Sequence, residues 1–433
     1  MSSSIILQAR QLVIDKNYND AELLYHNILY SDGNNENKLS NDYSIQEKEE
    51  SILDLGHLYK LTSNSEKLHS LILKSTEVLS IIAKSKISKI IRQLIDLFNF
   101  IPDSIDTQIL SLKEAISWAS KEKRSFLTQS LQLKLAQLYY KKFYFNDALN
   151  LTNSLSSHLR KLDDKNTLIE VQLLQSKIYY NLKNFSKSKA SLTSARTSAN
   201  SIYCSSKLQA DLDCMSGILH CQDNDFETAF SYFYEAFENL NSLNWSKESE
   251  SQIIKILKYI LLTKIMLNKN DDIIQILSNK LITSSKSIQN NLKQFDAIKK
   301  ISIAYNQKSL ENFQKILNDN SNEFSNDYLI KSNFKTLYHQ LLEQNLLKII
   351  KPYSCIEISY ISRLIKLDET FIESKLSQMI LDNVFYGVLD QGNGWLYIYD
   401  ENKIDKNYGS ALQLIKEMSK SVNLLYEKAT VLN

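Results

Sequence analysis

Glycine and proline are scarce in this sequence, with 7 Gly and 2 Pro among 433 residues. Tight turns, β-sandwich corners and phosphate-binding loops all need glycine, whereas long helices avoid both residue types. The scarcity therefore predicts a mostly α-helical protein. The length is enough for two or three packed units, and 43% apolar residues are enough to fill a large core.

Cysteine and net charge are also low. The four cysteines (Cys204, Cys214, Cys221 and Cys355) are too few for a disulfide framework in a chain of this length, and burial is the expected role of Cys214 and Cys221. Lys plus Arg (51) nearly balances Asp plus Glu (49), so the whole-chain field neither attracts nor repels nucleic acid strongly. No apolar run has the length of a membrane span, and Met1 to Arg10 lacks the features of a signal peptide. We therefore expect a protein of the cytoplasm and nucleus that does not contact membranes.

The sequence lacks the patterns of catalysis. Its six histidines are scattered singly, and there is no HExxH and no His-x-His with a downstream Asp that would bind zinc. There is also no GxGxxG and no GxxxxGK[ST] to bind a nucleotide phosphate. Adjacent carboxylates such as Asp163 and Asp164 point apart on a helix, which disfavours an acid/base pair. We expect no enzyme, no catalytic residue, no cofactor and no metal.

A repeat of about 40 residues is visible in the sequence. An aromatic residue is followed three positions later by a small residue at four places: Tyr18/Ala21, Phe145/Ala148, Phe185/Ser188 and Phe226/Ala229. Small residues also stand at equivalent positions before the last three: Ala136, Ser176 and Gly217. Small residues allow paired helices to approach closely, as in helix–turn–helix repeats. The sequence therefore predicts a right-handed TPR-like α-solenoid over residues 1–300, interrupted by a polar loop from Asn27 to Glu50.

The residues after Lys351-Pro352 predict a winged helix within residues 301–402. An apolar face of Ile358, Ile361 and Ile365 indicates a first helix. A second helix and two strands of a hairpin are expected at Glu369–Leu381, Val384–Leu389 and Trp395–Tyr399. Winged helices often bind DNA, but Lys366 to Asp382 has two lysines against four acidic residues and would be repelled by phosphates. We expect no nucleic-acid partner.

The second strand of this hairpin has two different faces. Trp395, Tyr397 and Tyr399 alternate and share one face, while Leu396 and Ile398 share the other. One face must cover the winged-helix core. The other is expected to pack against the C-terminal helix or against a neighbouring subunit, and the hairpin edge is open to strand addition. We assign the three aromatic residues to a protein interface.

The C-terminal segment 403–433 has the most regular period of the chain. Its apolar residues step by four and three positions: Ala411, Ile415, Met418, Val422, Leu425 and Ala429. This is the a/d seam of a helix in a bundle, and it is narrower than the stripe of a helix on a globular core. We assign Ile415, Met418, Val422 and Leu425 to a protein interface.

A basic stretch without acidic residues contains Lys183, Lys187, Lys189 and Arg196. One interpretation is a solvated face of the solenoid. The other is a docking face for an acidic protein surface, whose binding would weaken as salt is added.

A TPR-like solenoid followed by a winged helix resembles the PCI proteins. Within them, several segments are similar to the family of 26S proteasome non-ATPase regulatory subunit eleven (regulatory particle lid subunit six in fungi). These segments are Lys375–Asp382 with Phe385–Gly392, Lys189–Thr193 with Ala195–Arg196 and Ala199–Cys204, Met215–His220, and Leu341–Glu343 with Asn345–Leu346. The similarity extends from about Ala9 to the C-terminus.

This resemblance implies a non-catalytic scaffold of the proteasome lid. Members of the family hold lid, ATPase ring and core particle together, and they support lid assembly for ubiquitin-dependent degradation. The implied partners are the other PCI lid subunits, the isopeptidase subunit, and subunits of the proteasome α-ring and ATPase ring. Two alternatives with the same architecture remain open: a scaffold of the COP9 signalosome and a subunit of translation initiation factor three.

Overall fold

The structure is a computed structural model that describes residues 2–30, 45–78, 84–102, 104–242, 247–269, 271–277, 292–319, 327–399 and 406–432. The chain divides into two compact units, Met1–Thr263 and Lys264–Asn433. Helices dominate both units, as the scarcity of glycine and proline predicts. Within the described ranges, no helix is both long and apolar enough to cross a membrane. The domain bounds expected from the sequence stay a prediction.

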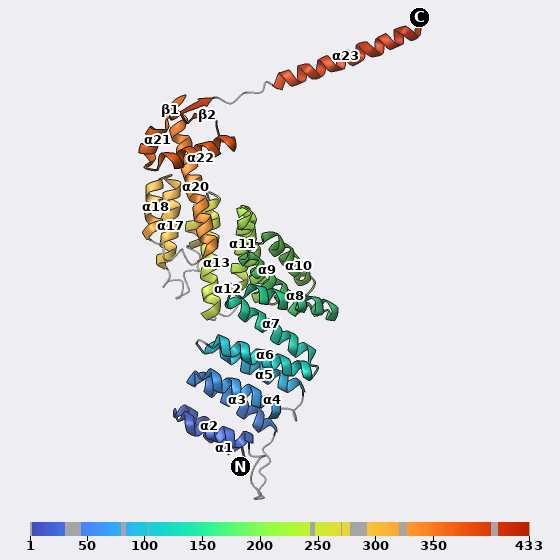
Figure 1. Cartoon of the computed structure of the whole chain (residues 1–433), viewed down its shortest axis with the longest axis vertical. Helices are drawn as coiled ribbons and strands as arrows, with labels where there is room; N and C mark the ends of the chain where they lie inside the picture. The colour runs from blue at the N-terminus through green and yellow to red at the C-terminus, as the bar shows by residue number, and fades with distance from the viewer. Residues whose placement is uncertain are drawn as a thin grey trace. The chain divides into compact units, whose positions relative to one another are not determined.

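The first unit consists of consecutive helices that pack on one another (Figure 1). Turns of two or three residues join many of them. The elements are α1 (Ser2–Ile14), α2 (Tyr18–Tyr30), α3 (Ile45–Thr62), α4 (Ser65–Val78), α5 (Lys84–Leu97), η2 (Phe98–Phe100), α6 (Ile105–Lys121), α7 (Ser125–Lys141), α8 (Phe145–Leu162), α9 (Lys165–Asn181), α10 (Phe185–Asn200), α11 (Ser206–Gln222), α12 (Phe226–Asn241) and most of α13 (Lys247–Met266).

The predicted repeat coincides with the starts of helices. The four aromatic residues of the repeat are the first residues of α2, α8, α10 and α12: Tyr18, Phe145, Phe185 and Phe226. The small residues three positions later are completely buried: Ala21, Ala148, Ser188 and Ala229. Between α9 and α10, the Ser176 hydroxyl donates to the Ser188 carbonyl oxygen at 3.1 Å, and the Ser188 hydroxyl donates to the Ser176 carbonyl oxygen at 2.9 Å. The prediction of paired helices in contact at small residues is confirmed.

Gly217 shows how close two paired helices come. A Cβ atom added at Gly217 in α11 would lie 2.7 Å from a ring carbon of Phe233 in α12, and Phe233 is completely buried. Real Cβ atoms do not approach a ring this closely, so any side chain here would force the two helices apart. Close packing of the two helices therefore requires a small residue at this position of the repeat.

Many helices end at a residue with a left-handed backbone, and none of these helix ends in the described ranges uses glycine. The residues concerned are Lys16, Ser63, Lys123, Phe143, Asp163, Lys183, Asn224, Asn268, Lys308, Lys366 and Asn383. Such a residue turns the chain so that amides of the turn bond to the last carbonyls of the helix. After α9, the Lys183 and Asn184 amides donate to the Tyr180 and Tyr179 carbonyl oxygens, both at 2.9 Å. All of these residues are polar except Phe143.

The second unit contains the rest of α13, further helices and one small sheet. Its elements are α14 (Asp271–Leu277), α17 (Leu292–Asn306), α18 (Leu310–Asp319), α20 (Tyr328–Ile350), β1 (Cys355–Glu357), α21 (Ile358–Ile365), α22 (Glu369–Leu381), β2 (Tyr386–Asp390), β3 (Trp395–Tyr399) and α23 (Lys406–Leu432). The predicted helices of the winged helix agree with α21 and α22, and the hairpin agrees with β2 and β3 to within two residues at its start.

The sheet has one strand that the sequence did not reveal. Its order is β1-β3-β2, all antiparallel, so β3 is central rather than an edge. Opposite Leu396 in β3 lie Ile356 of β1 and Leu389 of β2. Leu396 is completely buried and belongs to the same core cluster as Ile361 and Leu376. This core holds the sheet against α21 and α22.

The polar loop predicted from Asn27 to Glu50 is shorter than expected. Residues 27–30 are the last residues of α2, and α3 starts at Ile45. Ile28 and Leu29 are buried, so packing of the α2 face extends this helix into the polar stretch. Residues 31–44 of the predicted loop lie outside the described residues.

Candidate functional site

The four residues assigned to a bundle interface lie on α23 and are all exposed. Ile415, Met418 and Val422 are each 61% exposed, and Leu425 is 66% exposed. Three more apolar side chains flank this seam and are also exposed: Leu412, Leu414 and Tyr426. Exposed apolar surface of this extent marks an interaction site in soluble proteins. Because apolar residues flank the seam on both sides, the surface is wider than the contact with a single helix requires.

The aromatic face of the wing is exposed as well. Trp395, Tyr397 and Tyr399 point away from the core, and it is Leu396, with Ile398, that covers the core. Tyr386 and Val388 stand opposite Tyr399 and Tyr397 in β2 and are also exposed. These five residues form one apolar surface on the sheet. Its assignment to a protein interface stays a prediction.

One strand of the hairpin forms an edge of the sheet, where the sequence predicts strand addition. Since β3 pairs on both sides, the free edges of the sheet are β2 and the three-residue β1. A strand of another protein can therefore add to β2, next to the aromatic surface.

The basic stretch in α10 is partly neutralised within the chain. Arg196 Nη2 lies 2.5 Å from Asp213 Oδ1, and its guanidinium stacks at 4.2 Å on the Tyr232 ring. Lys189 forms an ion pair with Asp223. Lys187 and Lys183 are exposed, and Lys187 Nζ lies 5.9 Å from the centre of the Tyr179 ring. A docking face here stays a prediction.

Asp213 is a residue that sequence reasoning missed. Its carboxylate is completely buried in α11 and accepts hydrogen bonds from Arg196, Gln209 and Asn239. Burial raises the pKa of Asp213, although the three donors act in the opposite direction. The sequence carries no signal of its partners, and Asp213 stands only two residues after a second aspartate, Asp211. The pair is structural, since it joins α10 to α11 and opens onto no cavity among those found.

The lysine of α22, Lys375, is buried against α20 and paired with a carboxylate. Lys375 is 8% exposed, and its ammonium lies 2.7 Å from Glu343 Oε1 of α20. It also donates to Gln378 Oε1 at 3.2 Å. A buried, paired lysine does not contact phosphates, and the absence of a nucleic-acid partner stays a prediction.

Of the two cysteines in α11, Cys221 is buried, as expected, whereas Cys214 is only partly buried. Burial raises the pKa of Cys214 and of Cys221 to about 12. A thiol with so high a pKa has almost no thiolate at neutral pH, and the thiolate is the reactive form. We predict that iodoacetamide at pH 7.5 leaves both residues unmodified in the folded chain and modifies both in urea, as read by peptide mass spectrometry. Rapid labelling of either one without denaturant would contradict this packing.

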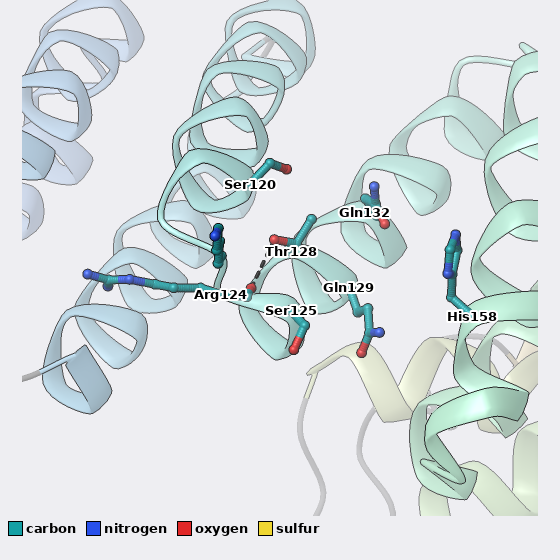
Figure 2. Close-up of a pocket in the computed structure, with 8 residues that line it drawn as sticks. Ser120, Arg124, Ser125, Thr128, Gln129, Gln132 and His158 are labelled. Carbon is teal, nitrogen blue, oxygen red and sulfur yellow. Dashed lines mark hydrogen bonds between the residues drawn. The ribbon is translucent and has the colours of Figure 1, made fainter.

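A cavity between α6 and α7 is lined by polar side chains. This cavity of about 420 Å³ lies at the α6–α7 turn (Figure 2). Gln129, Gln132 and His158 surround it, whereas the Arg124 side chain runs away from it and its guanidinium lies 4.5 Å from the centre of the Trp118 ring. No group of three or more His, Cys, Asp or Glu able to bind a metal occurs in the described ranges.

One cluster resembles a Ser-His-Glu triad. His69 Nδ1 lies 2.8 Å from Ser111 Oγ, and its Nε2 lies 3.5 Å from Glu114 Oε2. However, the Ser111 hydroxyl donates to the Thr107 carbonyl oxygen at 2.8 Å, so the ring nitrogen must donate to Oγ instead of accepting its proton. Ser111 is also 1% exposed. The cluster joins α4 to α6 and does not activate the serine.

Comparison with known proteins agrees with this architecture. The profile of the 26S proteasome regulatory subunit RPN6 N-terminal domain matches residues 2–142, and the PCI domain profile matches residues 317–400. The 26S proteasome regulatory subunit RPN6 of Saccharomyces cerevisiae is 47% identical over 100% of this chain and 99% of its own length. The chain belongs to the RPN6 family of 26S proteasome regulatory subunits. Another RPN6-family relative, from Schizosaccharomyces pombe, is 42% identical over the full length of both chains.

The RPN6 family also includes proteins named by the other convention. The 26S proteasome non-ATPase regulatory subunit 11 of Dictyostelium discoideum is 41% identical over 92% of this chain and 96% of its own length. The PCI match covers α20, the winged helix and its sheet. The resemblance inferred from the sequence motifs is thereby confirmed.

Proposed function

We propose that this chain is a non-catalytic scaffold subunit of the 26S proteasome lid, acting in ubiquitin-dependent protein degradation. The observation that carries the proposal is α23, whose apolar seam is exposed in a chain related to RPN6 over its whole length. A helix with apolar residues at the a, d and flanking positions is stable in water only when other helices cover it. A bundle of lid subunits supplies such helices.

The other two surfaces suit contacts with further subunits. The aromatic surface of the wing and the free edge of β2 fit the winged helix of another PCI lid subunit. The solenoid of the first unit offers a long surface for the α-ring and ATPase ring subunits. The isopeptidase subunit is the expected neighbour in the helix bundle. Through these contacts the chain would hold lid, ATPase ring and core particle together, in the cytoplasm and nucleus.

The absence of catalysis is part of this proposal. The nearest approach to a catalytic arrangement is the cluster of His69, Ser111 and Glu114, in which the serine proton is already donated elsewhere. We predict that a fluorophosphonate probe for activated serines does not label Ser111 in the native complex. Labelling at Ser111, abolished by His69→Ala, would overturn the non-catalytic assignment.

The alternatives have the same PCI architecture, but the relatives favour the proteasome. Each of the full-length relatives described above is named as a 26S proteasome subunit. Neither a signalosome subunit nor a translation initiation factor stands among them. We therefore keep those two functions as outcomes of the experiments below.

The proposal is tested by depleting the chain from cells and separating proteasomes on native gels with a fluorogenic peptide overlay. We expect capped particles to fall and free core particle to accumulate, because the lid no longer assembles. Re-expression of the full chain should restore capped particles. Unchanged capped particles after complete depletion would contradict a scaffold role, and altered polysomes or cullin modification would indicate one of the alternatives.

A further inference from the structure

Phe143 is an unusual residue in the turn between α7 and α8. Its φ of 64° lies in the left-handed region, where a bulky side chain is unfavourable. The other non-glycine residues with positive φ in the described ranges are Lys, Asn, Asp or Ser. Phe143 is also 74% exposed, so burial within the chain does not compensate for this conformation. Strain of this kind at an exposed position points to a role outside the fold.

Aromatic contacts hold Phe143 in a fixed position. Its ring meets the Phe145 ring edge-on at 6.0 Å, and the Phe145 ring lies 6.2 Å from the Tyr140 ring. The Tyr140 hydroxyl in turn accepts a hydrogen bond of 3.1 Å from Asn181, which lies at the end of α9. The turns α7–α8 and α9–α10 are thereby joined side by side. An aromatic group that is already immobilised loses little entropy when a partner binds it.

The charge of the two joined turns is positive. Residues 139–147 and 179–187 contain four lysines and one carboxylate: Lys141, Lys142, Lys183, Lys187 and Asp147. Lys142 forms an ion pair with Asp106. Lys141, Lys183 and Lys187 are exposed. Asp147 lies in the first turn of α8, where the helix dipole partly compensates its charge. Tyr144 and Leu182, both exposed, add apolar surface between the lysines.

We propose that these two turns form a docking surface, composed of Lys141, Phe143, Tyr144, Leu182 and Lys183, for an acidic segment of another protein that carries an apolar side chain. Phe143 and Tyr144 would contact the apolar side chain, and the lysines would contact the carboxylates around it. Exposed aromatic anchors with a charged rim are the usual composition of an interaction hot spot. The inference rests on the proposed scaffold function, since it places a second protein contact on the solenoid of the same subunit.

The experiment uses the full chain inside the assembled complex. A photoreactive benzoyl-phenylalanine replaces Phe143, and in a control chain it replaces Phe126, which is 65% exposed at the opposite end of α7. We expect a crosslink at position 143 to one protein segment in which Asp and Glu exceed Lys and Arg. No crosslink above the Phe126 control, or a crosslink to a basic segment, to lipid or to nucleic acid, would overturn the proposal.

A second measurement tests the residues individually. With the crosslinker at Tyr144, Phe143→Asn and the pair Lys141→Glu/Lys183→Glu should each lower the crosslink yield about tenfold, as expected for hot-spot residues. Asn adopts the left-handed conformation readily, so Phe143→Asn should fold normally. Phe126→Asn should leave the yield unchanged. Equal yields in all variants would refute the docking surface. A native gel of the same samples reports lid incorporation, so failure of this inference and failure of the scaffold function are distinguishable.

Discussion

Replacing both Met418 and Leu425 by aspartate is expected to abolish incorporation of the chain into the lid. Both residues lie in the exposed seam of α23, which the proposed bundle would bury. Truncating one such residue to alanine in a packed core typically costs about 2–5 kcal/mol, and a buried charge costs more. The pair should therefore weaken association by at least about 1000-fold. The lid fraction on a native gel measures the result.

The matched control changes the opposite face of the same helix. Gln413 and Lys420 are seven residues apart, as Met418 and Leu425 are, and both are exposed. Gln413→Asp with Lys420→Asp should incorporate normally. Because α23 is already exposed in the free chain, neither double variant should change the unfolding midpoint of the purified subunit. Normal incorporation of the Met418/Leu425 variant would show that the seam of α23 is not needed for assembly of the lid.

Replacing Arg196 by methionine is expected to destabilise the first unit by about 3 kcal/mol at pH 7. Methionine preserves much of the packing on Tyr232 but leaves the carboxylate of Asp213 buried without its cation. Removing one partner of a buried ion pair typically costs about 3–5 kcal/mol, and Arg196 is 27% exposed, which favours the lower end. Urea unfolding followed by circular dichroism measures the effect.

The penalty should depend on pH in a defined direction. Burial raises the pKa of Asp213 in the folded chain, so its contribution to the free energy of unfolding is greatest at low pH and falls as pH rises through the folded pKa. Arg196 acts to lower that pKa, and its removal raises the pKa further. The difference between wild type and Arg196→Met should therefore shrink between pH 7 and pH 5.

The double variant Arg196→Met/Asp213→Asn provides the control for this charge effect. It removes the buried negative charge and keeps the shape of the side chain, so it should recover much of the lost stability. Its loss of unfolding free energy relative to wild type should also depend less on pH between pH 7 and pH 5 than that of Arg196→Met. A penalty that is the same at both pH values in Arg196→Met would show that lost packing, rather than an uncompensated carboxylate, dominates.

Features that repeat along the chain were predictable from the sequence. The aromatic residues at the starts of α8, α10 and α12 recur at a fixed spacing, and so does the small residue three positions later. The seam of α23 was recognisable for the same reason, since its period requires no knowledge of the partner. The motifs around α22 carried the family resemblance. In each case the information lies within a short stretch of sequence.

Features that depend on distant residues were not predictable. β1 is three residues long, too short to display a period, and only its pairing with β3 defines it. Arg196 was placed in a basic face because the sequence around it holds no carboxylate, yet Asp213 of the next helix pairs with it. The exposure of Phe143 could not be predicted, because the sequence alone does not distinguish a phenylalanine in a turn from one in the core. Strand pairing, ion pairing and exposure at these positions are determined by tertiary packing.

The most direct test of the scaffold account is an affinity purification of the tagged full-length chain at moderate and at high salt, with partners identified by mass spectrometry. The account predicts that lid subunits are recovered at both salt concentrations, because the contact of α23 is apolar. Core and ATPase subunits should be recovered at moderate salt and lost at high salt, because charged contacts are screened. Recovery of signalosome or ribosomal partners in place of proteasome subunits would contradict the account.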